Sequence, residues 1–83
     1  MEVKANREAR KDMEALAPVV KAAALAEIKH LKKWPDVPGV KHLSGRLAGF
    51  ARVKVMKDWR MLFRVLPAHI VIVRVRHRSV VYK

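Results

Sequence analysis

The first half of the chain carries its apolar residues at helical spacing, after a short segment, residues 2–5, in which we expect a strand. Asn6 is suited to cap the helix that follows, because its side chain can accept a hydrogen bond from a first-turn N–H. The apolar positions of this helix, expected over residues 7–16, are Ala9, Met13, Leu16 and Ala17. Pro18 favours the first turn of a second helix. The apolar positions of the second helix are Val20, Ala24, Ile28 and Leu31, so the pattern predicts a helical hairpin.

The second half changes to the alternation that is typical of strands. Residues 35–49 are punctuated by proline and glycine and are expected to form a loop. Beyond Gly49 the apolar period is two. We expect antiparallel strands of a meander at residues 52–55, 59–65, 70–76 and 80–82. The predicted fold class is α+β: one domain over residues 1–83, with a short N-terminal strand and a two-helix hairpin packed on one face of a three- to four-stranded antiparallel sheet.

Strand pleating divides these alternating positions between two faces of the sheet. The face expected to pack under the helices is apolar and consists of Val53, Val55, Trp59, Met61, Phe63, Val65, Val71, Val73 and Val75. The opposite face is expected to combine three apolar residues (Leu62, Ile70 and Ile72) with six cations, namely Arg52, Lys54, Arg60, Arg64, Arg74 and Arg76. Like charges on one face repel each other and contribute little to folding. The six cations therefore indicate binding or chemistry, although a sheet face that is merely solvated is the alternative.

Basic residues dominate the composition. Lys and Arg number 19 against 7 Asp and Glu, which gives a net charge of +12 in 83 residues. Such a field attracts polyanions, so the expected partner is a nucleic acid or an acidic protein. The N-terminus lacks the apolar stretch of a signal peptide, no apolar run is long enough to span a membrane, and cysteine is absent. We therefore expect a cytoplasmic protein without disulfides and without a membrane partner.

The residues that most catalytic mechanisms need are poorly placed in this sequence. The four histidines lie at no metal-ligand spacing and almost all acids lie in the helical half, so we expect no metal, no cofactor and no paired-carboxylate mechanism. Lysines, arginines and two aromatic residues, Trp59 and Tyr82, remain. Such a set can cleave RNA when the ribose 2′-hydroxyl is the nucleophile. A lysine among other cations can act as the base, arginines can hold the phosphate, and a ring can stack on a nucleobase.

Three segments resemble the RelE/ParE toxin superfamily of type II toxin–antitoxin systems. They are the Leu43-Ser44-Gly45 loop with the strand that follows it, the Asp58-Trp59-Arg60 strand, and the final His77-Arg78-Ser79-Val80-Val81-Tyr82. The order of the expected elements also matches, so the resemblance spans the chain. The chain departs from the family pattern in three places. Tryptophan replaces the usual tyrosine at position 59, Met56-Lys57 stands where a glycine-bearing turn is common, and the sequence ends one residue after Tyr82, where many relatives continue into a short helix.

The resemblance implies a ribosome-dependent mRNA endonuclease that leaves a 2′,3′-cyclic phosphate or 3′-phosphate and a 5′-hydroxyl. Matching positions imply Lys54 as the base, Arg60 and Arg78 as stabilisers of the phosphorane, and Tyr82 as the residue that orients or stacks a base. His77 is a second candidate acid or base, although a lone histidine is more often structural. Arg52 would support phosphate binding. The further expected RNA-binding residues are Arg64, Arg74, Arg76 and Lys57. Trp59 is interpreted as core packing.

The resemblance also implies partners. A cognate antitoxin, acidic in its binding segment, would wrap the toxin and mask the basic face, and the pair would bind its own promoter DNA. An alternative within the superfamily is a ParE-like inhibitor of DNA gyrase without nuclease activity. A third interpretation is an RNA-binding relative that has lost toxicity. The joint presence of Lys54, Arg60, Arg78 and Tyr82 favours the nuclease.

Overall fold

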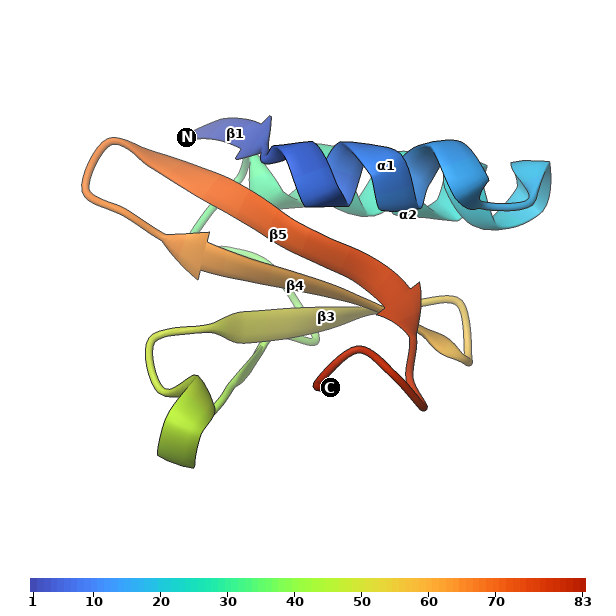
Figure 1. Cartoon of the computed structure of the whole chain (residues 1–83). Helices are drawn as coiled ribbons and strands as arrows, with labels where there is room; N and C mark the ends of the chain where they lie inside the picture. The colour runs from blue at the N-terminus through green and yellow to red at the C-terminus, as the bar shows by residue number, and fades with distance from the viewer.

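The N-terminal half folds as the apolar pattern predicts. The computed structural model describes all 83 residues and begins with β1 (Glu2–Ala5), α1 (Arg7–Ala15) and α2 (Pro18–Leu31). The Asn6 side chain accepts a hydrogen bond from the Ala9 N–H at 2.8 Å, which confirms the predicted cap. α1 packs against β5 and α2 against β3, so both helices cover the same face of the sheet (Figure 1). No helix combines the length and the apolar character that crossing a membrane requires.

The second half forms the predicted meander and adds two pieces of structure that the sequence did not indicate. The meander consists of β3 (Ala51–Val55), β4 (Trp59–Val65) and β5 (His69–His77). Within the predicted loop lie a two-residue strand, β2 (Lys41–His42), and a short 3₁₀ helix (Gly45–Leu47). The sheet has five strands in the order β1-β5-β4-β3-β2, and β1 runs parallel to β5. The α+β class is confirmed, but the sheet is mixed and larger than predicted, because β1 and β2 join it.

Because of a bulge in β5, the residues before the bulge face the opposite side of the sheet from the side predicted. Leu62 of β4 pairs with Arg74, whereas its neighbour Phe63 pairs with Ile72, so one extra residue of β5 is inserted between them. N-terminal to the bulge, Ile70 and Ile72 face the helices and are 0% and 1% exposed. The prediction that these isoleucines lie on the cationic face, with Val71 and Val73 in the core, is therefore wrong. C-terminal to the bulge the predicted alternation holds.

The face opposite the helices is partly covered by the end of the chain. Leu62 and Val81 are only 5% and 4% exposed, although Leu62 points away from the helices. Residues 78–82 form turns instead of the predicted strand. In Figure 1 this C-terminal segment turns back from the end of β5 toward β3. A hydrogen bond of 3.1 Å from Arg46 Nη2 to the Tyr82 carbonyl oxygen holds it there. Val65, predicted as core, is 36% exposed.

A candidate nucleic-acid interface

Three cations lie side by side across the face of the sheet that is turned away from the helices. Lys54 of β3 is directly opposite Arg60 of β4, and Arg60 is directly opposite Arg76 of β5. We call these three residues the cation row. Directly opposed residues in antiparallel strands have Cβ atoms about 5 Å apart, so the three basic side chains start from neighbouring positions on one face. The ion pairs of the molecule involve other basic side chains, namely Lys4, His30, Arg74 and Arg78.

Backbone carbonyl groups at one end of the sheet orient the central arginine of the row. Arg60 Nη1 donates to the carbonyl oxygens of Lys57 at 2.9 Å and of Trp59 at 2.8 Å. These bonds direct the guanidinium toward the turn between β3 and β4 without neutralising its charge. Since a guanidinium carries five N–H donors, the remaining donors are available to an anion. Lys57, one of the expected RNA-binding residues, lies exposed in this turn.

Three other predicted site arginines have side-chain partners inside the protein. Arg74 donates from Nε at 2.9 Å and from Nη2 at 3.0 Å to the carboxylate of Asp12. Arg78 Nε lies 3.5 Å from Asp58 Oδ1. The Arg64 guanidinium carbon lies 5.3 Å from the centre of the Phe50 ring, in cation–π contact. The face is therefore less uniformly free than six alternating cations predicted, and Arg74 in particular serves the fold.

The structure does not bring all the predicted catalytic residues together. His77 is directly opposite Trp59, on the helix side of the sheet, with the two rings 5.6 Å apart and nearly perpendicular. Its Nδ1 lies 2.8 Å from Ser79 Oγ. His77 is thus on the opposite face from the cation row. The sequence contained a signal for this, because His77 is two residues after the core residue Val75. Tyr82 lies on the cationic side, near Leu62 and Arg64.

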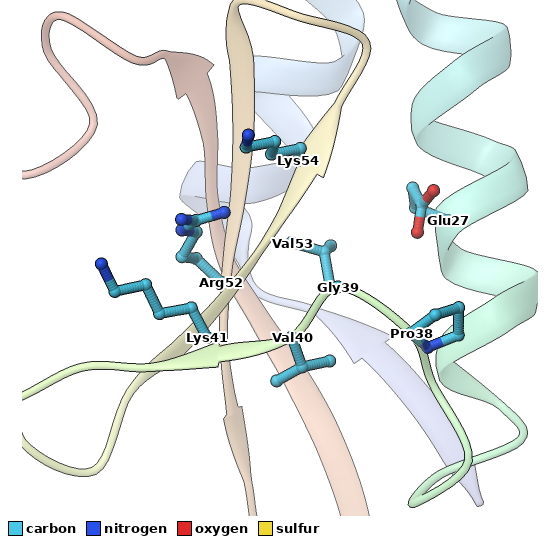
Figure 2. A pocket seen from close by; sticks show the side chains of 8 residues that line it. All are labelled: Glu27, Pro38, Gly39, Val40, Lys41, Arg52, Val53 and Lys54. Carbon is cyan, nitrogen blue, oxygen red and sulfur yellow. The ribbon is translucent and has the colours of Figure 1, made fainter.

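A groove at the free edge of β3 adjoins the cation row, and sequence reasoning missed it. Its volume is about 510 Å³, and it is lined by Glu27, Pro38, Gly39, Val40, Lys41, Arg52, Val53 and Lys54. Figure 2 shows Lys41, Arg52 and Lys54 on one side of β3 and Glu27 reaching toward the groove from α2. Lys41 enters the site because β2 pairs it directly with Arg52. A two-residue strand is too short to show alternation, so no sequence pattern indicates this pairing.

Comparison with solved structures identifies the class of protein that this fold defines. The chain resembles the YoeB/ParE toxin from Agrobacterium tumefaciens with a TM-score of 0.81 and 18% identity, over 93% of this chain and 98% of that one. It resembles a chain of the RelBE2 toxin–antitoxin complex from Mycobacterium tuberculosis with a TM-score of 0.78 and 28% identity, over 93% and 96% of the two chains. The fold is that of the RelE/ParE toxins of type II toxin–antitoxin systems.

The sequence family that the chain matches agrees with the family indicated by the fold. The family described as the ParE toxin of type II toxin–antitoxin system, parDE, matches residues 3–82. The chain therefore belongs to this family. No curated protein matches the chain. The YoeB dimer from Staphylococcus aureus, with a TM-score of 0.76, 14% identity and coverage of 93% and 95% of the two chains, shares the same fold.

Proposed function

We propose that this toxin is a ribosome-dependent mRNA endonuclease that works without a metal ion. The observation that carries the proposal is the cation row: Lys54, Arg60 and Arg76 are directly opposed on neighbouring strands, and none is paired with a carboxylate. Three adjacent unpaired cations cost stability, because like charges across a strand pair repel each other. A dianionic phosphorane is the kind of charge that such a row stabilises.

In this mechanism the RNA supplies its own nucleophile. Lys54 first releases its own proton to solvent, and the free amine then takes the proton from the ribose 2′-hydroxyl, which attacks the adjacent phosphorus. Arg60 and Arg76 hold the non-bridging phosphate oxygens with charge-assisted hydrogen bonds. The bond to the 5′-oxygen then breaks, a water molecule donates the proton that this leaving oxygen needs, and the products are a 2′,3′-cyclic phosphate and a 5′-hydroxyl. Arg76, expected only to bind RNA, takes a place next to the reacting phosphate in this proposal.

The C-terminal segment contributes to the same end of the sheet. The Arg78 N–H donates to the Asp58 carbonyl oxygen at 2.8 Å, so Arg78 and Arg60 both contact the turn between β3 and β4. From this position Arg78 would reach the phosphate after exchanging Asp58 for it. Tyr82 would stack on a nucleobase beside Arg64. His77 has no chemical role in the proposal, because it lies on the other face.

An acidic antitoxin is the proposed protein partner. Related structures are described as the RelB–RelE antitoxin–toxin complex from Methanococcus jannaschii and the YoeB–YefM complex from Staphylococcus aureus. A net charge of +12 gives this chain the complementary field for an acidic segment. We propose that such a segment covers the cation row and so blocks RNA, and that only the complex binds promoter DNA.

The nuclease proposal is tested in a coupled translation reaction, with mRNA ends mapped by primer extension. Wild-type toxin should produce cuts that require ribosomes. Lys54→Ala should slow cutting by about 100-fold or more, as expected when a general base is lost. Arg60→Ala and Arg76→Ala should also slow it, whereas Lys29→Ala, on α2, should not. Equal cutting by all four variants would refute the assignment of the cation row.

A ParE-like gyrase inhibitor is the second candidate. Two observations favour it: the matching family is that of ParE, and none of the three hollows on the surface is lined by Arg60 or Arg78. A gyrase supercoiling assay run beside the translation reaction separates the two functions. Intact mRNA together with a loss of supercoiling would establish the gyrase inhibitor and exclude the nuclease.

A further inference from the structure

The groove beside the cation row exists because β2 ends before β3 does. β2 pairs only with Ala51 and Arg52. The Leu43 N–H donates to the Phe50 carbonyl oxygen at 3.0 Å. Hydrogen-bonded pairs alternate in antiparallel strands, so the backbone N–H and C=O of Lys54 point toward the edge that β2 leaves open.

The backbone of the preceding loop keeps this edge uncovered. Gly39 has a φ of +79°, a left-handed conformation that an L-residue rarely adopts, and its Cα has open space around it. The chain therefore turns away from β3 at the position where a longer β2 would have paired with Lys54. The groove is a consequence of this turn, and α2 forms its far wall.

The groove passes over the edge of β3, and its two sides have opposite electrostatic character. Lys41, Arg52 and Lys54 form the cationic wall, and no carboxylate pairs with any of them. The other wall carries Glu27, whose side chain is 24% exposed and whose Oε2 lies 3.5 Å from His30 Nδ1. Figure 2 shows these groups on either side of β3. An occupant matched to the groove must present an anion to one wall and N–H donors to the other.

We infer that this groove is a subsite for one nucleotide of the RNA strand, next to the cleaved phosphate. Its phosphate would lie against Lys41 and Arg52, and its base would donate a hydrogen bond to Glu27. The inference rests on the proposed function, because it extends the RNA path from the cation row to the edge of β3. A volume of about 510 Å³ lies within the usual range of small-ligand sites. An acidic peptide fits less well, because Glu27 would repel its carboxylates.

The carboxylate gives the subsite a preference among bases. Ionised Glu27 only accepts hydrogen bonds. Cytosine presents its N4 amino group as a donor, whereas uracil presents an acceptor oxygen at the same position. Matched contacts of this kind discriminate between bases by about tenfold. The subsite should therefore favour cytosine over uracil, two bases of the same size.

The test measures binding without cleavage. Short 2′-O-methyl oligonucleotides of cytosine or uracil lack the nucleophile, and fluorescence anisotropy gives their affinity at several salt concentrations. Lys41→Ala should lower the slope of log affinity against log salt by about 0.7, the value for one contact to single-stranded RNA. Lys29→Ala, which removes the same charge from the opposite side of α2, should lower it less. Wild-type protein should prefer the cytosine oligonucleotide, and Glu27→Gln should abolish that preference.

Three results would overturn the inference. The first is an equal salt slope for Lys41→Ala and Lys29→Ala. The second is the absence of the effect assigned to Glu27. Wild-type protein would then bind both oligonucleotides with the same affinity, or Glu27→Gln would still prefer the cytosine oligonucleotide. The third is binding of a polyglutamate peptide that depends on Lys41 while RNA binding does not, which would assign the groove to an acidic protein segment. Intact mRNA in the translation reaction, together with RNA binding that depends on Lys41, would refute the nuclease and leave the groove as an RNA-binding site that is not adjacent to a cleaved phosphate.

Discussion

The contact between Asp12 and Arg74 fastens α1 to the free edge of β5, and its removal should destabilise the fold. β1 ends at Ala5, so the later residues of β5 have no neighbouring strand on that side. Asp12 fills this gap. Its Oδ2 accepts from Arg74 Nε and from the Val75 N–H, both at 2.9 Å, and its Oδ1 accepts from Arg74 Nη2 at 3.0 Å. The perturbation is therefore Asp12→Ala.

The expected loss follows from these three hydrogen bonds. A hydrogen bond to a charged group contributes about 1.5–3 kcal/mol, and breaking a fully buried ion pair costs about 3–5 kcal/mol. The two side chains are 14% and 32% exposed, so water compensates part of the loss. Asp12→Ala should thus lower the free energy of unfolding by about 2–3 kcal/mol. Domains of this size have only about 4–12 kcal/mol in total. Asp12→Asn, which keeps an acceptor for one N–H, should lose less.

Urea unfolding followed by circular dichroism measures this loss. Glu14→Ala is the matched control, because Glu14 lies on the same helix and has no ion pair. The double variant Asp12→Ala/Arg74→Ala gives the coupling energy between the two side chains. An Asp12→Ala variant as stable as Glu14→Ala would refute the reasoning. Arg74 would then be free to bind RNA, as the alternation had predicted.

Three further changes test other parts of the structure. Met56 has a φ of +56° in the turn between β3 and β4, so Met56→Gly should relieve about 0.5–1 kcal/mol of backbone strain and raise the melting temperature by a few degrees. Leu62→Ala should cost about 2–4 kcal/mol in urea unfolding and speed hydrogen exchange of the Val81 N–H, since both side chains are nearly buried on the cationic side. His77→Ala should leave the rate of mRNA cutting unchanged. A loss of cutting as large as that caused by Lys54→Ala would show that His77 takes part in the reaction.

The helices, their cap and the three long strands were predictable because each rests on a local pattern. The β5 bulge was not. Residues 70–73 are all apolar, so the hydrophobic pattern is satisfied whether the even-numbered or the odd-numbered residues face the core. A residue inserted here therefore does not change the pattern. The C-terminal segment was misassigned for a related reason. Val80, Val81 and Tyr82 have strand-forming side chains, but Val81 is buried in a turn against the sheet and not in a strand.

The candidate site was predictable only as far as strand alternation reaches. Alternation placed Lys54, Arg60 and Arg76 on one face, and the observed register makes them direct neighbours. Contacts with residues distant in sequence determine which of the other basic side chains are paired and which join the site. Asp12 is 62 residues from Arg74, and β2 brings Lys41 to Arg52 through a loop without periodicity. Charge patterns predict which residues share a face, whereas contacts between distant elements decide which of them remain free.

If the cation row exists for function, it should oppose folding, and one substitution can show this. Lys54→Glu would place a carboxylate directly opposite Arg60, turning a repulsive cross-strand pair into an attractive one worth about 0.2–1 kcal/mol. Lys54→Gln separates the loss of repulsion from the gain of attraction. We expect the urea midpoint to rise from Lys to Gln to Glu while mRNA cutting is lost in both variants. A urea midpoint that falls from Lys to Gln to Glu would mean that the three cations stabilise the sheet. Their position side by side would then be explained by folding and would not indicate RNA binding.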